Sequence, residues 1–193
     1  MNDSALRLAS DAEAVFRAGL SRVDPAAMVR QALRVGPPAP GRGGRGELVV
    51  RTELEEARYP LDAFDRVLVA GMGKAGASMA RGLEEALGDR IAGGVVAVKE
   101  GHLERLTRIR LVEASHPVPD ERSRAAAEEV LGLGRGVDER TLVVVLISGG
   151  GSALLCAPRR GSPSRTRPRR RSSSSPPGRR SRRSTACAST SRR

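Results

Sequence analysis

The sequence predicts an α/β protein, a parallel-rich α/β/α sandwich with N-terminal helices and a disordered C-terminal tail. Three observations support this fold class. Short, uninterrupted aliphatic runs alternate with helical stretches, a pattern typical of parallel strands that are covered on both faces. Three of these runs end in loops rich in glycine or proline. The tail from Arg159 contains no Leu, Ile, Val, Met or Phe and therefore cannot bury a core.

The N-terminal part is predicted to be helical and the middle of the chain to alternate between strands and helices. Residues 4–34 carry apolar residues at helical spacing in two pieces that break at Asp24-Pro25, and residues 37–46 form a flexible loop of Pro and Gly. We expect buried strands over residues 66–70, 94–98, 109–113 and 141–147, and helices over residues 74–87 and 121–133. A further helix begins at Ser152. Together these elements predict a Rossmann-like sandwich over residues 48–158, within one domain of residues 1–158.

The formal net charge of +12 is unevenly distributed along the 193 residues. The tail, residues 159–193, holds thirteen arginines and no acid, so residues 1–158 are close to neutral. A basic tail favours nonspecific attraction to nucleic acid, and this is one candidate function. The tail has no aromatic side chains on which bases could stack, so we expect no specific nucleic-acid partner.

The apolar stretches, the N-terminal residues and the cysteines indicate where in the cell the protein is expected. The longest apolar stretch, residues 142–147, is far shorter than the ~20 residues that a membrane span requires, so no membrane partner is expected. Residues 1–4 do not resemble the start of a secretory signal. Cys156 and Cys187 have neither metal-ligand nor redox spacing, which favours a reduced, cytoplasmic location.

The first candidate site is the turn Gly71-Met72-Gly73-Lys74-Ala75-Gly76, which follows a strand and opens a helix. Glycines allow a phosphate to approach the backbone, and a helix N-terminus offers free N–H groups. The turn matches the dinucleotide fingerprint G-x-G-x-x-G, and Glu100 lies about where a ribose-binding acid is expected. A nicotinamide-dependent oxidoreductase is therefore one hypothesis, although Lys74 puts a cation where that fingerprint rarely needs one. A purely structural turn is the other alternative.

Two further loops follow predicted strands. Residues 148–152, Ser-Gly-Gly-Gly-Ser, offer consecutive N–H groups and two hydroxyls, Ser148 and Ser152, for an anion. Three glycines in a row cost backbone entropy, which favours phosphate binding over a structural turn for Gly149, Gly150 and Gly151. In the other loop, residues 114–120, His116 could orient or protonate a ligand, or be merely structural. All three loops follow the carboxyl ends of strands, where ligands bind in open α/β sheets.

These segments together resemble a known family. RVLVAGMGKAGASMARGLEEALGD, GGVVAVKEGH, EASHPVPDERS and LVVVLISGGGSALLCAP are similar to the N-terminal domain of bacterial glycerate 2-kinases, the MOFRL-associated family, whose members are often named hydroxypyruvate reductases. The resemblance covers about residues 4–158. Two positions depart from the family pattern: Ser115 replaces a usual Gly, and Glu100 replaces a common aromatic.

The resemblance implies phosphorylation of D-glycerate at its 2-hydroxyl by ATP with Mg²⁺, in a cleft between two domains. By the same resemblance, Lys74 with Gly71 and Gly73 would bind the substrate or the transferring phosphoryl group, and Lys74 would be catalytic. The loop of residues 148–152 would hold phosphate, and His116 would line the cleft. We expect no metal-ligating residues in this chain. Formation of a homodimer is possible. An NAD(P)H-dependent hydroxypyruvate reductase is the alternative enzyme.

The tail is compatible with translation in a shifted reading frame. If one base is lost near Pro158, GC-rich codons for residues 159 onward can be chosen so that the original frame has helical apolar spacing and ends in VRKHLS, as the family does. We therefore expect a truncated kinase that is inactive without its second domain. The basic tail as a functional nucleic-acid contact is the alternative.

Overall fold

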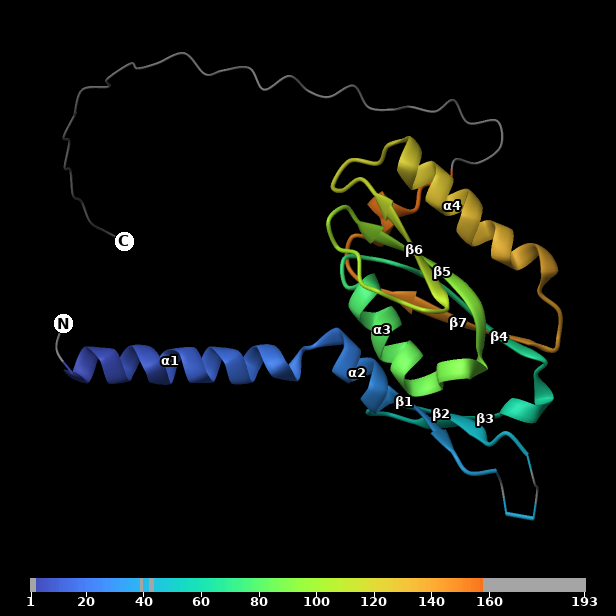
Figure 1. Cartoon of the computed structure of the whole chain (residues 1–193), viewed down its shortest axis with the longest axis horizontal. Coiled ribbons are helices and arrows are strands. Elements are labelled where there is room, and N and C mark those ends of the chain that lie inside the picture. The colour runs from blue at the N-terminus through green and yellow to red at the C-terminus, as the bar shows by residue number, and fades with distance from the viewer. Residues whose placement is uncertain (1–2, 39, 42–43, 158–193) are drawn as a thin grey trace, which may run out of the picture.

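The computed structural model describes residues 3–38, 40–41 and 44–157. The predicted tail, residues 159–193, and the reading-frame hypothesis concern a segment outside the described residues. Within them, two sheets and five α-helices are arranged as Figure 1 shows. No helix in this part of the chain is both long and apolar enough to cross a membrane.

The main sheet has four parallel strands in the order β6-β5-β4-β7. Their bounds are Arg66–Met72 for β4, Ile91–Lys99 for β5, Ile109–Ala114 for β6 and Thr141–Ile147 for β7. Each predicted strand is therefore confirmed, and β4 and β5 are longer than expected. Because the strands are parallel, the loops that follow β4, β6 and β7 emerge at one edge of the sheet.

Helices lie on both faces of this sheet, which confirms the three-layer prediction. Helix α3 (Gly76–Leu87) covers one face and packs Ala80, Leu83 and Leu87 against Val67 and Val96. Helix α4 (Glu121–Leu133) covers the other face, where Ala126 contributes to a smaller core with Ala97, Ala114 and Leu154. The short α5 (Gly151–Leu154) begins directly after the glycine loop.

The expectation that every strand is covered on both faces is wrong for β7. Val143, Val145 and Ile147, which share one face of this edge strand, are exposed at 39%, 56% and 62%. Helix α4 packs over β5, β6 and β4 and leaves this face of β7 open. The uninterrupted aliphatic run is thus an unreliable guide to burial at the edge of the sheet.

A second, antiparallel sheet, β1-β2-β3, was not predicted. Its strands are β1 (Leu33–Gly36), β2 (Glu47–Arg51) and β3 (Glu56–Pro60), so residues 48–60 lie outside the parallel sandwich in which we had placed them. Leu48 and Val49 are buried, and Leu48 joins the core beneath α3. The strands were missed because they are short and carry charged residues on their exposed face.

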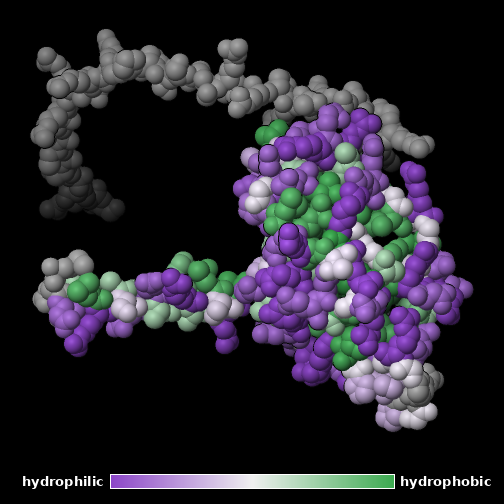
Figure 2. Space-filling model, in the orientation of Figure 1, coloured by the Kyte–Doolittle hydropathy of each residue, from purple (hydrophilic) through white to green (hydrophobic). Residues whose placement is uncertain are grey.

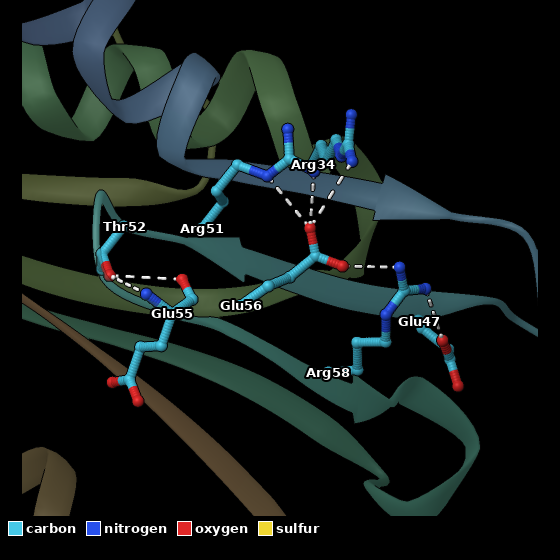
Figure 3. Close-up of polar contacts among 7 residues, drawn as sticks. All are labelled: Arg34, Glu47, Arg51, Thr52, Glu55, Glu56 and Arg58. Atoms are coloured by element: carbon cyan, nitrogen blue, oxygen red, sulfur yellow. Dashed lines mark hydrogen bonds and ion pairs between the residues drawn. The ribbon is translucent and has the colours of Figure 1, made fainter.

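These charges form a surface network around Glu56 (Figure 3). Arg51 Nε donates to Glu56 Oε2 at 3.0 Å, and Arg58 Nη2 donates to Glu56 Oε1 at 2.5 Å. The hydrogen bonds from Arg58 and Arg51 lower the pKa of the Glu56 carboxyl. The network links β2 to β3 across the open face of the sheet, and Arg34 of β1 lies 3.9 Å away.

The two N-terminal helices are confirmed, and they differ in their surroundings. Helix α2 (Pro25–Ala32) is capped by the Asp24 side chain, which accepts from Ala27 N–H at 2.7 Å, and it packs closely on α3. Helix α1 (Asp3–Arg22) has no buried residue. Figures 1 and 2 show it as an arm that projects from the body, with apolar and polar side chains at its surface.

Candidate anion-binding site

Three loops meet at the carboxyl edge of the main sheet, as parallel strands require. They follow β4, β6 and β7 and contain Lys74, His116 and Gly150. A Cβ atom placed on Gly150 would lie 3.0 Å from His116 Nε2 and 3.2 Å from Lys74 Cε. The imidazole and the lysine side chain therefore converge on one point of the glycine loop. The structure brings together residues separated by up to 76 positions in the chain.

The backbone of the first loop is used within the protein. The four N–H groups of residues 73–76 donate, in chain order, to Ala97 O at 3.1 Å, Gly149 O at 3.0 Å, Ser148 Oγ at 3.1 Å and Gly73 O at 3.0 Å. A dinucleotide fingerprint needs such N–H groups for the pyrophosphate. The backbone of the first loop is therefore used for contacts within the protein, mainly with the second loop. The group of the first loop that remains for a ligand is the Lys74 side chain.

The second loop has the opposite character. The N–H groups of residues 149–152 make no hydrogen bond to another described residue, whereas Ser148 N–H donates to Met72 O at 3.0 Å. Gly149 and Ser152 are exposed. Ser148 is half-buried, and its hydroxyl already accepts the hydrogen bond from Ala75. Ser148 thus joins the two loops, and the N–H groups that follow it have no hydrogen-bond partner among the described residues, although Gly151 itself is buried.

Two glycines are required by their backbone conformation. Gly73 has φ +136° and a Cβ there would lie 2.0 Å from Ser148 Oγ, while Gly150 has φ +88° and precedes α5. Two of the other three predicted glycines allow close packing: a Cβ on Gly71 would lie 2.8 Å from Leu146 O, and one on Gly151 would lie 2.9 Å from Met72 Cγ, whereas one on Gly149 would have nothing within 4 Å. The sequence motif is therefore explained mainly by how the loops fit together.

The electrostatics of the site are positive. Desolvation lowers the pKa of His116 below its usual value, and the positive charges of Lys74 and Lys99 lower it further. A neutral imidazole beside two ammonium groups can accept a proton or a hydrogen bond, while the lysines attract an anion. The site is suited to a compact oxyanion.

Lys99 is the residue that sequence reasoning missed. It ends β5, and the only available signal was that the chain contains two lysines, Lys74 and Lys99. Glu100, considered earlier as a ribose ligand, forms an ion pair with Arg122 at 3.1 Å instead. Its carboxylate is held on the side of α4.

The described residues offer no obvious metal site. They contain no group of three or more His, Cys, Asp or Glu side chains that could hold a metal ion. An open groove of about 440 Å³ lies on the other side of Lys74, between α3 and the loop after β5, with Pro25, Ser78 and His102 in its wall. Lys74 borders both this groove and the glycine loop.

Comparisons with known proteins identify a family and several relatives of this chain. The profile of a family described as "Domain of unknown function (DUF4147)" matches residues 11–165. A protein of Agrobacterium vitis named "Putative hydroxypyruvate reductase" is 47% identical over 79 residues, 41% of this chain and 20% of that protein. "Glycerate 2-kinase" of Pyrococcus horikoshii is 43% identical over 78 residues, 40% of this chain and 17% of that protein.

One solved structure supports the fold. The crystal structure of the PH0495 protein from Pyrococcus horikoshii has a TM-score of 0.60 and 34% sequence identity, and the match covers 72% of this chain and 28% of that one. The chain thus spans well under a third of the length of the relatives it matches. Since the family profile covers most of the sequence and the relatives bear these names, the chain belongs to the glycerate 2-kinase family, through its DUF4147 domain.

Proposed function

We propose that the chain supplies the N-terminal part of a glycerate 2-kinase, which transfers the γ-phosphoryl group of ATP to the 2-hydroxyl of D-glycerate. The observation that supports this most directly is the convergence of Lys74 and His116 on Gly150. Phosphoryl transfer depends on positioning and on neutralising the charge of the transferring group. The two side chains and the N–H groups of residues 149–152, which have no partner among the described residues, are the kinds of group that such a step uses.

Each residue has a distinct role in this proposal. Lys74 would place its ammonium beside the transferring phosphoryl group, where negative charge grows in the transition state. The N–H groups of residues 149–152 would donate to phosphate oxygens, and Gly150 would let the ligand approach the backbone. His116, whose pKa is lowered, would be neutral near pH 7 and able to accept a hydrogen bond from a substrate hydroxyl.

The described residues fit ATP and D-glycerate as anions, and they contain no group of three or more His, Cys, Asp or Glu side chains that could hold a metal ion without a ligand. Kinases usually hold Mg²⁺ through one or two carboxylates together with the substrate phosphates. We therefore assign no Mg²⁺ ligand here and place that requirement on the whole enzyme. We further propose that residues 159–193 are translated out of frame, and that this chain lacks activity without a second domain to close the site and exclude water.

Hydroxypyruvate reductase is the second candidate, because relatives bear that name. A reductase of the dinucleotide-binding type would use the N–H groups of residues 73–76 for the pyrophosphate and an acid such as Glu100 for the ribose. Those N–H groups donate within the protein and Glu100 is paired with Arg122. The geometry therefore favours the kinase.

The experiment has two parts. The gene is sequenced again across codons 150–165, and the in-frame protein is assayed with ATP plus D-glycerate and with NADH plus hydroxypyruvate. We expect ADP formation that depends on D-glycerate, reduced about 10²–10³-fold in turnover by Lys74→Ala, which removes one electrostatic contact with the transition state. NADH oxidation without ADP formation would overturn the kinase proposal, and full activity of Lys74→Ala would overturn the role of Lys74. An unchanged reading frame would overturn the out-of-frame interpretation of the tail.

A further inference from the structure

The two lysines of the chain, like some of its arginines, take no part in the ion pairs of the described residues. All sixteen ion pairs among the described residues are made by arginine, and neither Lys74 nor Lys99 forms an ion pair or a side-chain hydrogen bond with another described residue. Most cationic side chains in this chain are arginine, yet the charges of both lysines act on His116 and lower its pKa. Two unpaired cations gathered beside one imidazole repel each other unless an anion lies between them.

The fold places Lys99 at this edge of the sheet. It is the last residue of β5 and pairs in register with Ala114, two residues before His116. Lys99 lies on the same face of β5 as Ala97, because residues two apart in a strand share a face, and Ala97 packs with Leu154 of α5. Lys99 therefore lies on the side of the sheet where the glycine loop enters α5.

The acidic residues near Lys99 are occupied elsewhere. Glu100 pairs with Arg122 at 3.1 Å, and Glu113 Oε1 accepts from Gly101 N–H at 2.7 Å. Each acid thus has a partner that holds it in place. The positive charge of Lys99 is left available to a ligand.

We propose that Lys99 is a second anion-binding residue of this site, and that Lys74 and Lys99 together hold one compact oxyanion group, a phosphate or a carboxylate, beside His116 and Gly150. The inference deepens the proposed kinase function and rests on the same site. A lysine suits this position because its ammonium is a compact charge on a flexible stem and can follow a small ligand. An arginine would instead present a wide planar fork.

The test measures oxyanion binding to the chain as it exists. Inorganic phosphate, D-glycerate and ATP are titrated separately at constant ionic strength, with NMR detection, into the parent chain, Lys99→Gln, Lys99→Arg and Lys74→Gln. Arg135→Gln is the control. It also removes one positive charge, from an exposed side chain that forms no ion pair with another described residue. Arg135 follows α4 and lies next to Gly136, whose carbonyl accepts from Arg66 at the start of β4, so it is at the opposite edge of the sheet. The His116 ring signals show whether each variant keeps the folded site.

We expect Lys99→Gln to weaken binding of at least one of the three anions about tenfold, the effect of losing one hydrogen bond to a charged group, and Lys99→Arg to restore it in part. Loss of phosphate affinity would identify a phosphate subsite, and loss of D-glycerate affinity alone would identify a carboxylate subsite. Arg135→Gln should change each affinity less than twofold.

Three outcomes separate this inference from the proposed function. If Lys99→Gln binds all three anions like the parent, or no more weakly than Arg135→Gln, the inference is wrong while the kinase proposal stands on Lys74. If phosphate binding depends on both lysines while the in-frame protein forms no ADP with D-glycerate, the inference holds and the kinase proposal fails. If none of the three anions binds to the parent, the inference is overturned, and the assay of the in-frame protein decides the kinase proposal.

Discussion

The hydroxyl of Ser148 accepts a hydrogen bond from the backbone N–H of Ala75 at 3.1 Å, and this contact joins two glycine-rich loops that are 73 residues apart. A second hydrogen bond in the same direction, from Lys74 N–H to Gly149 O at 3.0 Å, lies next to it, and Ser148 N–H donates back to Met72 O at 3.0 Å. Each loop therefore fixes the position of the other. Because the Lys74 backbone takes part in these contacts, they determine where the Lys74 side chain lies in the site.

Replacing Ser148 should loosen the joint. Ser148→Ala leaves Ala75 N–H without its partner in a half-buried position, and we expect a loss of about 1–3 kcal/mol in the free energy of unfolding. Urea denaturation measures this loss, and the amide of Ala75 should exchange faster with solvent. Ser152→Ala is the control: its side chain is exposed, so its stability should stay within about 0.5 kcal/mol of the parent. Equal stability of the two variants would show that the Ser148 hydroxyl is not what joins the loops.

Gly73→Ala should lower the free energy of unfolding, whereas Gly132→Ala should not. The new Cβ would meet Ser148 Oγ at 2.0 Å and Ser148 O at 2.7 Å, and φ is +136°. Backbone strain of this kind costs about 1–3 kcal/mol, and the clash adds to it. Gly132→Ala in α4 has nothing within 4 Å and should be neutral or more stable by about 0.5–1 kcal/mol, since alanine favours helix. Gly73→Ala should lower the urea midpoint, whereas Gly132→Ala should leave it unchanged or raise it.

Much of the fold could be predicted from the sequence, because β4, β5, β6 and β7 are aliphatic runs and the residues between them have helical spacing. The sheet β1-β2-β3 could not, because its strands are only four or five residues long and Arg51, Glu56 and Arg58 interrupt its apolar pattern. The site was found only in outline. Glycine motifs mark where loops turn, but no local signal shows that Ser148 accepts from Ala75 or that Lys99 lies near His116. Such contacts depend on strand order, which one sequence does not specify.

His116 gives a direct measure of the charge in the site. We expect its NMR titration midpoint below the usual histidine pKa of about 6.5, because of desolvation first and then Lys74 and Lys99. Lys74→Gln and Lys99→Gln should each raise the midpoint toward that value, whereas Arg135→Gln should leave it unchanged. The signal is assigned by its absence in His116→Asn. A midpoint that neither lysine variant moves would contradict the proximity of these charges.

The same shift predicts how stability depends on pH. An unfolded chain takes up the histidine proton near pH 6.5, while the folded chain takes it up at lower pH, so the unfolded state binds more protons in between. The contribution of His116 is therefore fully present above about pH 6.5 and is lost as the pH falls through the folded pKa. The free energy of unfolding is measured for the parent and for His116→Asn from pH 8 to pH 5. The stability of the parent relative to His116→Asn should decrease as the pH falls.

The core beneath α3 should dominate stability. Leu83 is fully buried, and Leu83→Ala should cost about 2–5 kcal/mol, the range for removing a large aliphatic side chain from a packed core. Phe16 in α1 is 66% exposed, so Phe16→Ala should change the free energy of global unfolding by less than about 0.5 kcal/mol. Thermal denaturation monitored by near-ultraviolet signals of the body separates the two cases. A comparable loss in both variants would mean that α1 is covered in solution.

Helix α1 also determines how the molecule melts. Its twenty residues bury nothing, and its local support consists of the exposed pairs Asp3–Arg7 and Glu13–Arg17, worth about 0.3–0.5 kcal/mol each. A helix of this length without tertiary contacts is marginal in water. The arm is thus thermodynamically a tethered peptide, whose helix–coil equilibrium is independent of the body. On heating, the far-ultraviolet helical signal should decline gradually from low temperature before the body unfolds in one cooperative step, and trypsin should cleave near Arg22 while the body is still folded.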